Sequence, residues 1–128
     1  MDRTSKRGAG FTLIELLVVM SIIALLLAIA VPRYFHSLTR AREAVLRENL
    51  LLMRDALDKH YADTGKYPET LTDLVSKKYL RKLPEDPITG SADTWIIFPP
   101  DRRDQGGVYD VKSGAPGNSV SGVPYSQW

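Results

Sequence analysis

Residues able to support chemistry are few and widely spaced in this 128-residue chain. The histidines, His36 and His60, fall on one predicted helix but too far apart along it to share a ligand. We expect both to be surface or packing residues. Serine, histidine and aspartate occur without a Gly-x-Ser-x-Gly nucleophile signature. The absence of cysteine excludes disulfides and thiolate metal sites. The sequence gives no support for catalysis, and we expect a protein that is not an enzyme.

Glu15 is the acidic residue whose position most clearly demands a partner. It is the only charged residue in the 21-residue apolar run 11–31. At about 1.5 Å per residue, a helix of that length can cross a bilayer. A carboxylate near the centre of such a helix costs roughly 2.5–3.5 kcal/mol, and less near its end. We therefore expect a membrane-spanning helix in which another group compensates the charge of Glu15.

The residues before this run are basic and set its expected orientation. Residues 1–10 carry Arg3, Lys6 and Arg7, which favour a cytoplasmic N-terminus and place the rest of the chain in the periplasm. An ordinary secretory signal has a shorter apolar core followed by a small-residue cleavage site. Residues 28–30, Ala-Ile-Ala, could imitate such a site. A secreted enzyme released by cleavage near Ala30 therefore remains an alternative.

Helical periodicity continues past the apolar run, so we predict one long helix from Phe11 to about Ala62. Pro32 either ends the membrane helix or kinks a continuous one, and the resumed periodicity favours a kink or local unwinding. The second half should bury an apolar stripe and expose a charged back. The predicted stripe consists of Leu38, Ala41, Val45, Leu46, Leu50, Leu52, Met53, Ala56, Leu57 and Tyr61. The predicted charged back includes Arg40, Arg42, Glu43, Arg47, Glu48, Arg54, Asp55, Asp58 and Lys59.

The remaining residues predict a small domain of mixed helix and strand. Gly65 should end the long helix, and residues 70–75 combine a cap-like start with one apolar side of a short helix. Residues 95–98 and 108–111 are predicted strands, separated by a polar hairpin-like segment. The expected contacts of the C-terminal tail with the domain are made by Val123, Tyr125 and Trp128.

Charge composition argues against nucleic-acid binding. The chain carries a formal net charge of +2, but residues 1–10 account for all of it. The rest of the chain is neutral, so it offers no electrostatic attraction for a phosphate backbone.

The N-terminal sequence resembles the processing signal of type IV pilins and of the pseudopilins of type II secretion. The resemblance runs without a gap from Lys6 to about Pro32 and includes Lys-Arg-Gly-Ala-Gly followed by Phe-Thr-Leu-Ile-Glu. In that family a prepilin peptidase cuts after the glycine that corresponds to Gly10, and the new N-terminal residue, here Phe11, is N-methylated. The resemblance also implies that Glu15 pairs with the α-amino group of Phe11 in a neighbouring subunit during filament assembly.

The second half of the chain adds to this resemblance. Residues 64–68, 82–87 and 108–111 occur in the order expected for the major pseudopilin of type II secretion. The implied fold is pilin-like: a long N-terminal helix, transmembrane then amphipathic, packed on a small antiparallel sheet with a C-terminal loop. Family members bind calcium through aspartates in that loop, but residues 113–122 contain no carboxylate here. Asp110 alone would make a weak site, so we expect no cofactor and regard calcium as disfavoured.

The resemblance implies a structural subunit of a type II secretion pseudopilus. Its expected parts are a cleaved leader (1–10), a transmembrane and polymerisation helix (11–31) and a periplasmic globular domain (32–128). Its implied partners are prepilin peptidase, copies of itself in a helical filament, other pilin-like subunits and an inner-membrane assembly platform. Its implied location is the bacterial inner membrane, as a single-pass protein, and then the periplasmic filament. A type IV pilus subunit and a single-span anchor for a periplasmic binding domain remain alternatives.

Overall fold

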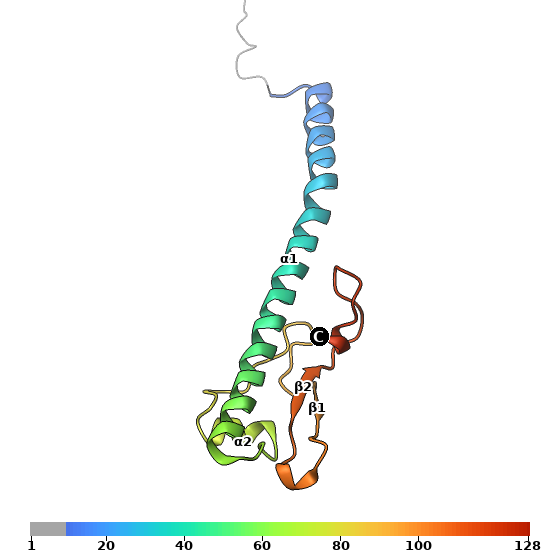
Figure 1. The fold of residues 1–128 in the computed structure, drawn as a ribbon. Helices are drawn as coiled ribbons and strands as arrows, with labels where there is room; N and C mark the ends of the chain where they lie inside the picture. The colour runs from blue at the N-terminus through green and yellow to red at the C-terminus, as the bar shows by residue number, and fades with distance from the viewer. Residues whose placement is uncertain (1–9) are drawn as a thin grey trace, which may run out of the picture. The chain divides into compact units, whose positions relative to one another are not determined.

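The computed structural model describes residues 10–128, so residues 1–9 of the predicted leader lie outside the described residues. Backbone contacts divide the chain into two compact units, one ending at Leu38 and the other running from Thr39 to Trp128. The predicted α+β class is confirmed, because a long N-terminal helix is followed by a two-stranded antiparallel sheet (Figure 1).

The elements follow the predicted order closely. Helix α1 comprises Leu13–Thr64 and helix α2 comprises Leu71–Ser76. Strands β1 and β2 comprise Trp95–Phe98 and Asp110–Ser113. Two short 3-10 turns, η2 (Arg103–Gln105) and η3 (Tyr125–Gln127), complete the chain.

Helix α1 continues through Pro32 and ends where the sequence predicts. Pro32 lies inside the helix, so the interpretation that Val31 and Pro32 end it is wrong. At the other end, Gly65 adopts a positive φ of 76°, and its N–H donates to the carbonyl of Tyr61 at 2.8 Å. This is the left-handed conformation in which glycine commonly closes a helix.

The predicted apolar stripe of α1 is confirmed along its centre and wrong along its margins. Leu46, Leu50, Met53, Ala56 and Leu57 are all buried in the second unit. The predicted members Ala41, Val45, Leu52 and Tyr61 are exposed instead. The buried face also includes two polar residues, Glu43 and His60. The face of α1 covered by the domain is therefore narrower than the apolar pattern predicts, and it includes a residue assigned to the charged back.

The sheet forms as predicted, with its second strand shifted by two residues. Trp95 pairs with Ser113 and Phe98 with Asp110, so β2 is Asp110–Ser113 instead of 108–111. Val108 is buried, but its N–H donates to the carbonyl of Pro68 at 2.9 Å and not to β1. Because Val108 bonds to the Tyr67-Pro68 turn, it does not belong to the hydrogen-bonded ladder between β1 and β2.

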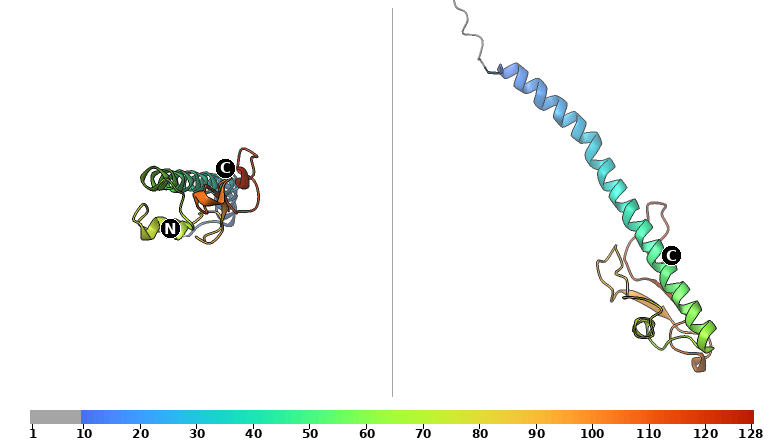
Figure 2. Two further views of the ribbon diagram at one scale, coloured as in Figure 1. Left: turned by 60° about the horizontal axis from the view of Figure 1, so that its bottom comes forward. Right: turned by 90° about the vertical axis from the view of Figure 1, so that its left-hand side faces the viewer.

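One core joins the elements of the second unit. Figures 1 and 2 both show β1 and β2 alongside the second half of α1. Tyr125 is buried in the core and Trp128 packs against it, as predicted for the tail. Val123 remains 42% exposed, so its predicted packing role is wrong. The core consists of Leu46, Leu50, Met53, Ala56, Leu57, Leu71, Leu74, Leu80, Trp95, Val108, Val111, Ala115 and Tyr125.

Candidate functional site

Thr12 and Glu15 form hydrogen bonds with each other at the N-terminus of α1. The hydroxyl of Thr12 accepts a hydrogen bond from the N–H of Glu15 at 3.1 Å and lies 3.1 Å from the Glu15 carboxylate, to which it donates. The carbonyl of Thr12 accepts the N–H of Leu16 at 3.1 Å, which begins the helical ladder. Thr12 therefore caps the helix. The cap satisfies one of the free N–H groups at the helix N-terminus, which also attract a carboxylate.

Glu15 retains an unsatisfied charge in this arrangement. Only its Oε1 atom accepts the Thr12 hydroxyl. Among residues 10–128, the ion pairs link other side chains, and none involves Glu15. Glu15 lines a surface hollow of about 250 Å³ together with Ile14, Val18 and Val19. A carboxylate beside three aliphatic side chains is a suitable partner for a cation supplied from outside the subunit.

Gly10 and Phe11 precede the helix and are exposed. They lie outside α1, which begins at Leu13, and Phe11 is 80% exposed. A peptide bond between these residues would be accessible to a protease before the regular helix begins. Processing at this position stays a prediction. Cleavage there would place a new amino group four residues before Glu15.

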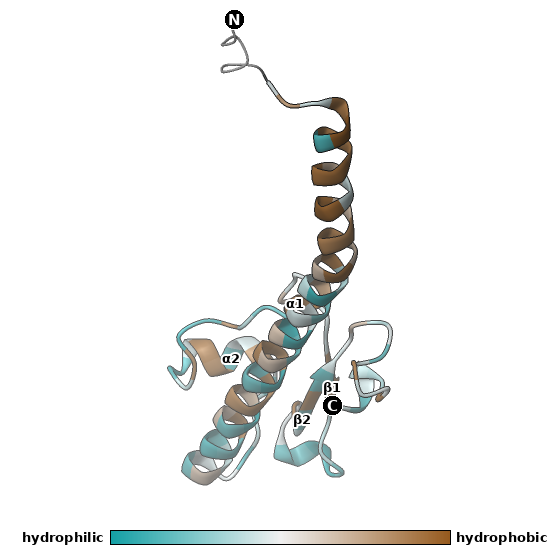
Figure 3. Cartoon of the chain, turned by 90° about the horizontal axis from the view of Figure 1, so that it is seen from above, coloured by the Kyte–Doolittle hydropathy of each residue, from teal (hydrophilic) through white to brown (hydrophobic). Residues whose placement is uncertain are grey.

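The first unit presents apolar side chains on every side of its helix. Figure 3 shows this part of α1 mostly as brown, hydrophobic turns, with one teal, hydrophilic band near the start. Its large apolar side chains from Leu13 to Val31 are between 44% and 82% exposed. Among the described residues, α1 alone is long and apolar enough to cross a membrane. Such a surface requires lipid or other protein around it.

Asp110, the weak calcium candidate, already has a cationic partner. The Nε of Arg54 donates to Oδ1 of Asp110 at 3.0 Å, and the N–H of Val111 donates to the same oxygen at 2.8 Å. Both groups are donors, so Oδ1 of Asp110 already has two hydrogen-bond partners. Within residues 10–128, no three His, Cys, Asp or Glu side chains gather closely enough to hold a metal ion.

The two histidines have different environments and no shared site. His36 is exposed, whereas His60 is buried. The Nδ1 of His60 lies 2.6 Å from the carbonyl of Lys66, and its Nε2 lies 3.3 Å from the Lys77 ammonium. These contacts hold the loop after α1 and the end of α2 to the helix. His60 is therefore a packing residue, as the sequence predicts.

Three side chains that make these contacts, Thr12, Glu43 and Arg54, are not among the residues predicted from the sequence to do so. Thr12 was detectable, because Thr12-Leu13-Ile14-Glu15 has the spacing of a helix capping box. Glu43 and Arg54 belong to the predicted charged back of the helix. Both side chains bind residues more than 50 positions later in the chain, and no local sequence pattern predicts such contacts.

Comparison with known proteins agrees with the chemistry of this N-terminal segment. The prokaryotic N-terminal methylation motif matches residues 5–31. The type II secretion system core protein G of Klebsiella michiganensis is 31% identical, over 97% of this chain and 90% of that protein. The protein of the same name from Escherichia coli strain K12 is 26% identical, over 89% of this chain and 86% of its own length.

A more distant similarity connects the chain with a pilus protein. The type IV major pilin protein PilA of Myxococcus xanthus is 30% identical over 74 residues, which cover 58% of this chain and 34% of that protein. No solved structure matches the chain.

Proposed function

Because the chain belongs to the family of type II secretion system core protein G, we propose that it is a structural subunit of a type II secretion pseudopilus, assembled through its N-terminal helix. It is not an enzyme. The observation that carries this function is that the methylation motif at 5–31 coincides with a helical segment whose large apolar side chains are exposed. Lipid covers that surface before assembly, and copies of the same helix cover it afterwards.

Processing by prepilin peptidase creates the end that assembles. Cleavage after Gly10 removes the basic leader 1–10 and gives Phe11 a free α-amino group, which is then N-methylated. A secondary amine formed in this way remains a cation at neutral pH. The exposed position of Gly10 and Phe11 before the helix supports this site of cleavage.

In the filament, the charge of Glu15 is then compensated by a neighbouring subunit. The Glu15 carboxylate has one oxygen without a partner among residues 10–128 and lies in an apolar hollow. The Phe11 amine of a second copy would supply the missing cation. Opposite charges attract more strongly in apolar surroundings than in water, so a subunit without this pairing would leave a costly bare charge in the filament.

The subunit is a single-pass membrane protein before assembly. We assign its N-terminus to the cytoplasm from the basic leader, and its globular domain, from residue 32 onwards, to the periplasm. We place the unassembled protein in the bacterial inner membrane and the assembled protein in a periplasmic filament. Its further partners in this proposal are other pilin-like subunits and an inner-membrane assembly platform.

Co-expression of the full chain with a prepilin peptidase tests this function. Intact-mass analysis should show a chain that begins at Phe11 and carries one added methyl group. A mature start near Val31 would instead indicate a secreted product and would overturn the proposal. Gly10→Leu should leave an uncut precursor that forms no filaments. A mere membrane anchor would tolerate that change.

A type IV pilus subunit is the second candidate, favoured only by the similarity to the Myxococcus xanthus pilin. That similarity covers 34% of the pilin, whereas the chain spans 90% of a secretion relative. Complementation separates the two functions. The gene should restore protein export in a strain lacking its secretion pseudopilin, and it should not restore pili in a strain lacking its pilin.

A further inference from the structure

The C-terminal segment folds into a tight loop after β2. The N–H of Ser119 donates to the carbonyl of Val123 at 2.8 Å, and the N–H of Gly122 donates to the carbonyl of Ser119 at 2.9 Å. A bridge between Asn118 and Pro124 closes the loop, which we call the C-terminal loop (residues 117–125). A glycine-rich loop has a large ordering cost, so contacts with the rest of the domain must stabilise it.

A single oxygen of Glu43 makes the central contact with this loop. Its Oε2 atom accepts the N–H of Val120 at 3.0 Å and the hydroxyl of Tyr125 at 2.7 Å. Glu43 is buried on α1, and Tyr125 is buried in the core. One anion therefore ties both sides of the C-terminal loop to the helix. Hydrogen bonds to a charged acceptor are roughly twice as strong as bonds between neutral groups.

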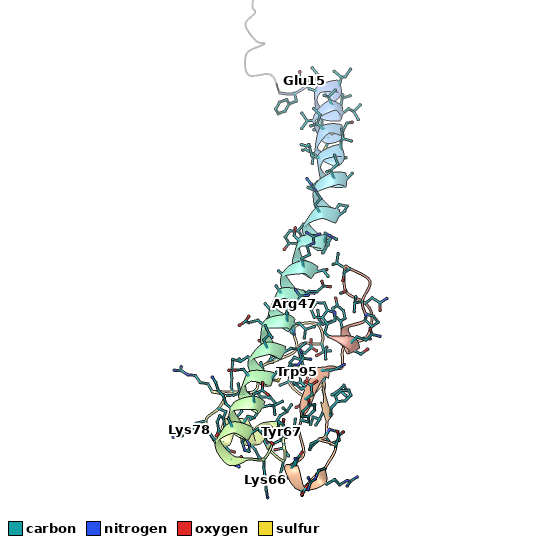
Figure 4. The ribbon with its side chains drawn as sticks, viewed as in Figure 1. Glu15, Arg47, Lys66, Tyr67, Lys78 and Trp95 are labelled. Atoms are coloured by element: carbon teal, nitrogen blue, oxygen red, sulfur yellow. The ribbon has the colours of Figure 1, made fainter. Side chains whose placement is uncertain are left out.

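Two arginines of the same helix hold the end of the chain. The Nη2 of Arg54 donates to the main-chain oxygens of Val111 at 3.0 Å and Trp128 at 2.6 Å. The guanidinium of Arg47 lies 4.7 Å from the centre of the Trp128 ring, a cation–π contact. Figure 4 shows Arg47 on the part of α1 beside the C-terminal segment.

These contacts do not fit a calcium ion. Calcium requires six to eight oxygen acceptors that converge on one point. In the C-terminal loop the converging groups are donors, the N–H of Val120 and the hydroxyl of Tyr125, and they converge on an anion. Asp110 is engaged by Arg54. Residues 113–122 contain no carboxylate. The arrangement of charge is the reverse of a cation site.

We propose that Glu43 is the positioning residue of the C-terminal loop, and that its carboxylate, together with Arg54, orders residues 117–128 without a divalent cation. The negative charge at this position comes from the helix, and the loop supplies hydrogen-bond donors to it. This proposal does not depend on the proposed filament function. A chain that failed to polymerise would still show it.

Amide hydrogen exchange of the full chain in detergent micelles tests the proposal. Wild type, Glu43→Ala, Glu43→Gln and the control Glu48→Ala are compared, each in chelator and in millimolar calcium. Glu48 is an exposed residue of the same helix, so its substitution reports the generic effect of losing a carboxylate there. In wild type the exchange of residues 117–125 should be the same with calcium and with chelator.

Glu43→Ala should accelerate exchange of Val120 and its neighbours by roughly ten- to a hundredfold, the effect of losing hydrogen bonds to a charged group. Core amides of residues 46–57 should keep their protection, which shows that the domain remains folded. Glu43→Gln should lie between Glu43→Ala and wild type, because its amide oxygen still accepts both bonds without the charge. Glu48→Ala should behave as wild type.

Two results would overturn the proposal: wild-type protection of residues 117–125 in Glu43→Ala, or wild-type protection that requires calcium. If Glu43→Ala loses core protection, Tyr125→Phe replaces it, since this change removes one donor and leaves the ring in place. Faster exchange of residues 117–125 in Tyr125→Phe, with the core protected, supports the role of Glu43. Unchanged exchange in that variant overturns it.

Discussion

The Tyr125 hydroxyl donates a 2.7 Å hydrogen bond to the buried carboxylate of Glu43, across 82 residues of sequence. Burial of the phenol, then this hydrogen bond and the negative charge of Glu43, raise the pKa of Tyr125 to about 12. All three favour the neutral phenol, which is the form that can donate. The pair is therefore stable only while the tyrosine keeps its proton.

This relationship predicts a loss of stability in strong alkali. The folded pKa of Tyr125, about 12, lies above the ordinary tyrosine pKa of 10.0. The unfolded chain therefore releases this proton first as the pH rises, and the contribution of Tyr125 is complete below pH 10 and is lost between about 10 and 12. The free energy of unfolding of the full chain in micelles, measured by denaturant titration at several pH values, should fall over that range.

The variants Tyr125→Phe and Glu43→Gln separate this contribution from those of other tyrosines. Tyr125→Phe should make the alkaline decline shallower by on the order of 2 kcal/mol. Glu43→Gln should lower the pKa of Tyr125 because the negative charge is gone, while burial still holds it above the ordinary value. An alkaline decline identical in wild type and Tyr125→Phe would contradict the assignment.

A matched pair of leucines on α1 tests which face the domain covers. Leu50 is 2% exposed and Leu52 is 48% exposed, although both were predicted to be buried. Leu50→Ala should lower the free energy of unfolding of the domain by about 2–5 kcal/mol, because it leaves a cavity in the core. Leu52→Ala should change it by less than about 1 kcal/mol. Equal losses would place both side chains in the core.

Leu50 and Leu52 show which features of the buried face sequence periodicity can predict. The apolar positions of α1 identify a helix and the centre of its buried face, because the 3.6-residue repeat is a local property. They do not give the width of that face, because width depends on how much of the helix a small two-stranded sheet can cover. Val45 and Leu52 satisfy the repeat and remain exposed for this reason. The shift of β2 has a similar origin, since the bond from Val108 to Pro68 joins distant segments.

The candidate site divides in the same way. The unusual position of Glu15 can be recognised from the sequence, because the cost of a charge in an apolar run depends only on its neighbours in the chain. The cap formed by Thr12 could also have been recognised, from its spacing to Glu15. The contacts of Glu43 and Arg54 with the C-terminal segment could not be predicted from the sequence, because a charged residue on a helix is most often exposed to solvent. The absence of acids in residues 113–122 indicated only that something other than a metal must hold the tail.

Trp128 should contribute to stability through its ring. It is partly buried against the core, stacks edge-on with Tyr125 at 5.5 Å and lies under the Arg47 guanidinium. Trp128→Ala should lower the free energy of unfolding by roughly 1.5–3 kcal/mol and reduce the melting temperature. Trp128→Phe keeps an aromatic face and should lose less. A Trp128→Ala chain that melts with wild type would mean that the ring does not hold the tail.

Two substitutions at the start of α1 separate the charge of Glu15 from its role in the cap. Thr12→Ala removes the hydroxyl that caps the helix but keeps the carboxylate, and should weaken the helix start by about 0.5–2 kcal/mol. Glu15→Gln keeps a side chain that can accept the Thr12 hydroxyl but removes the charge. If Glu15 assembles the filament by attracting a Phe11 amine, Glu15→Gln should be cleaved normally and form few filaments. Thr12→Ala should be cleaved and retain most of its assembly.

Filament yield by electron microscopy and cleavage by intact mass should be measured on the same cultures. Glu48→Gln, on the exposed side of the helix, controls for the general loss of a carboxylate. If each subunit contact loses an ion pair worth about 1.4 kcal/mol, the affinity of that contact falls tenfold. The loss of filaments in Glu15→Gln should therefore be large. The opposite ranking, with Thr12→Ala more damaging than Glu15→Gln, would show that the cap and not the charge is what assembly requires.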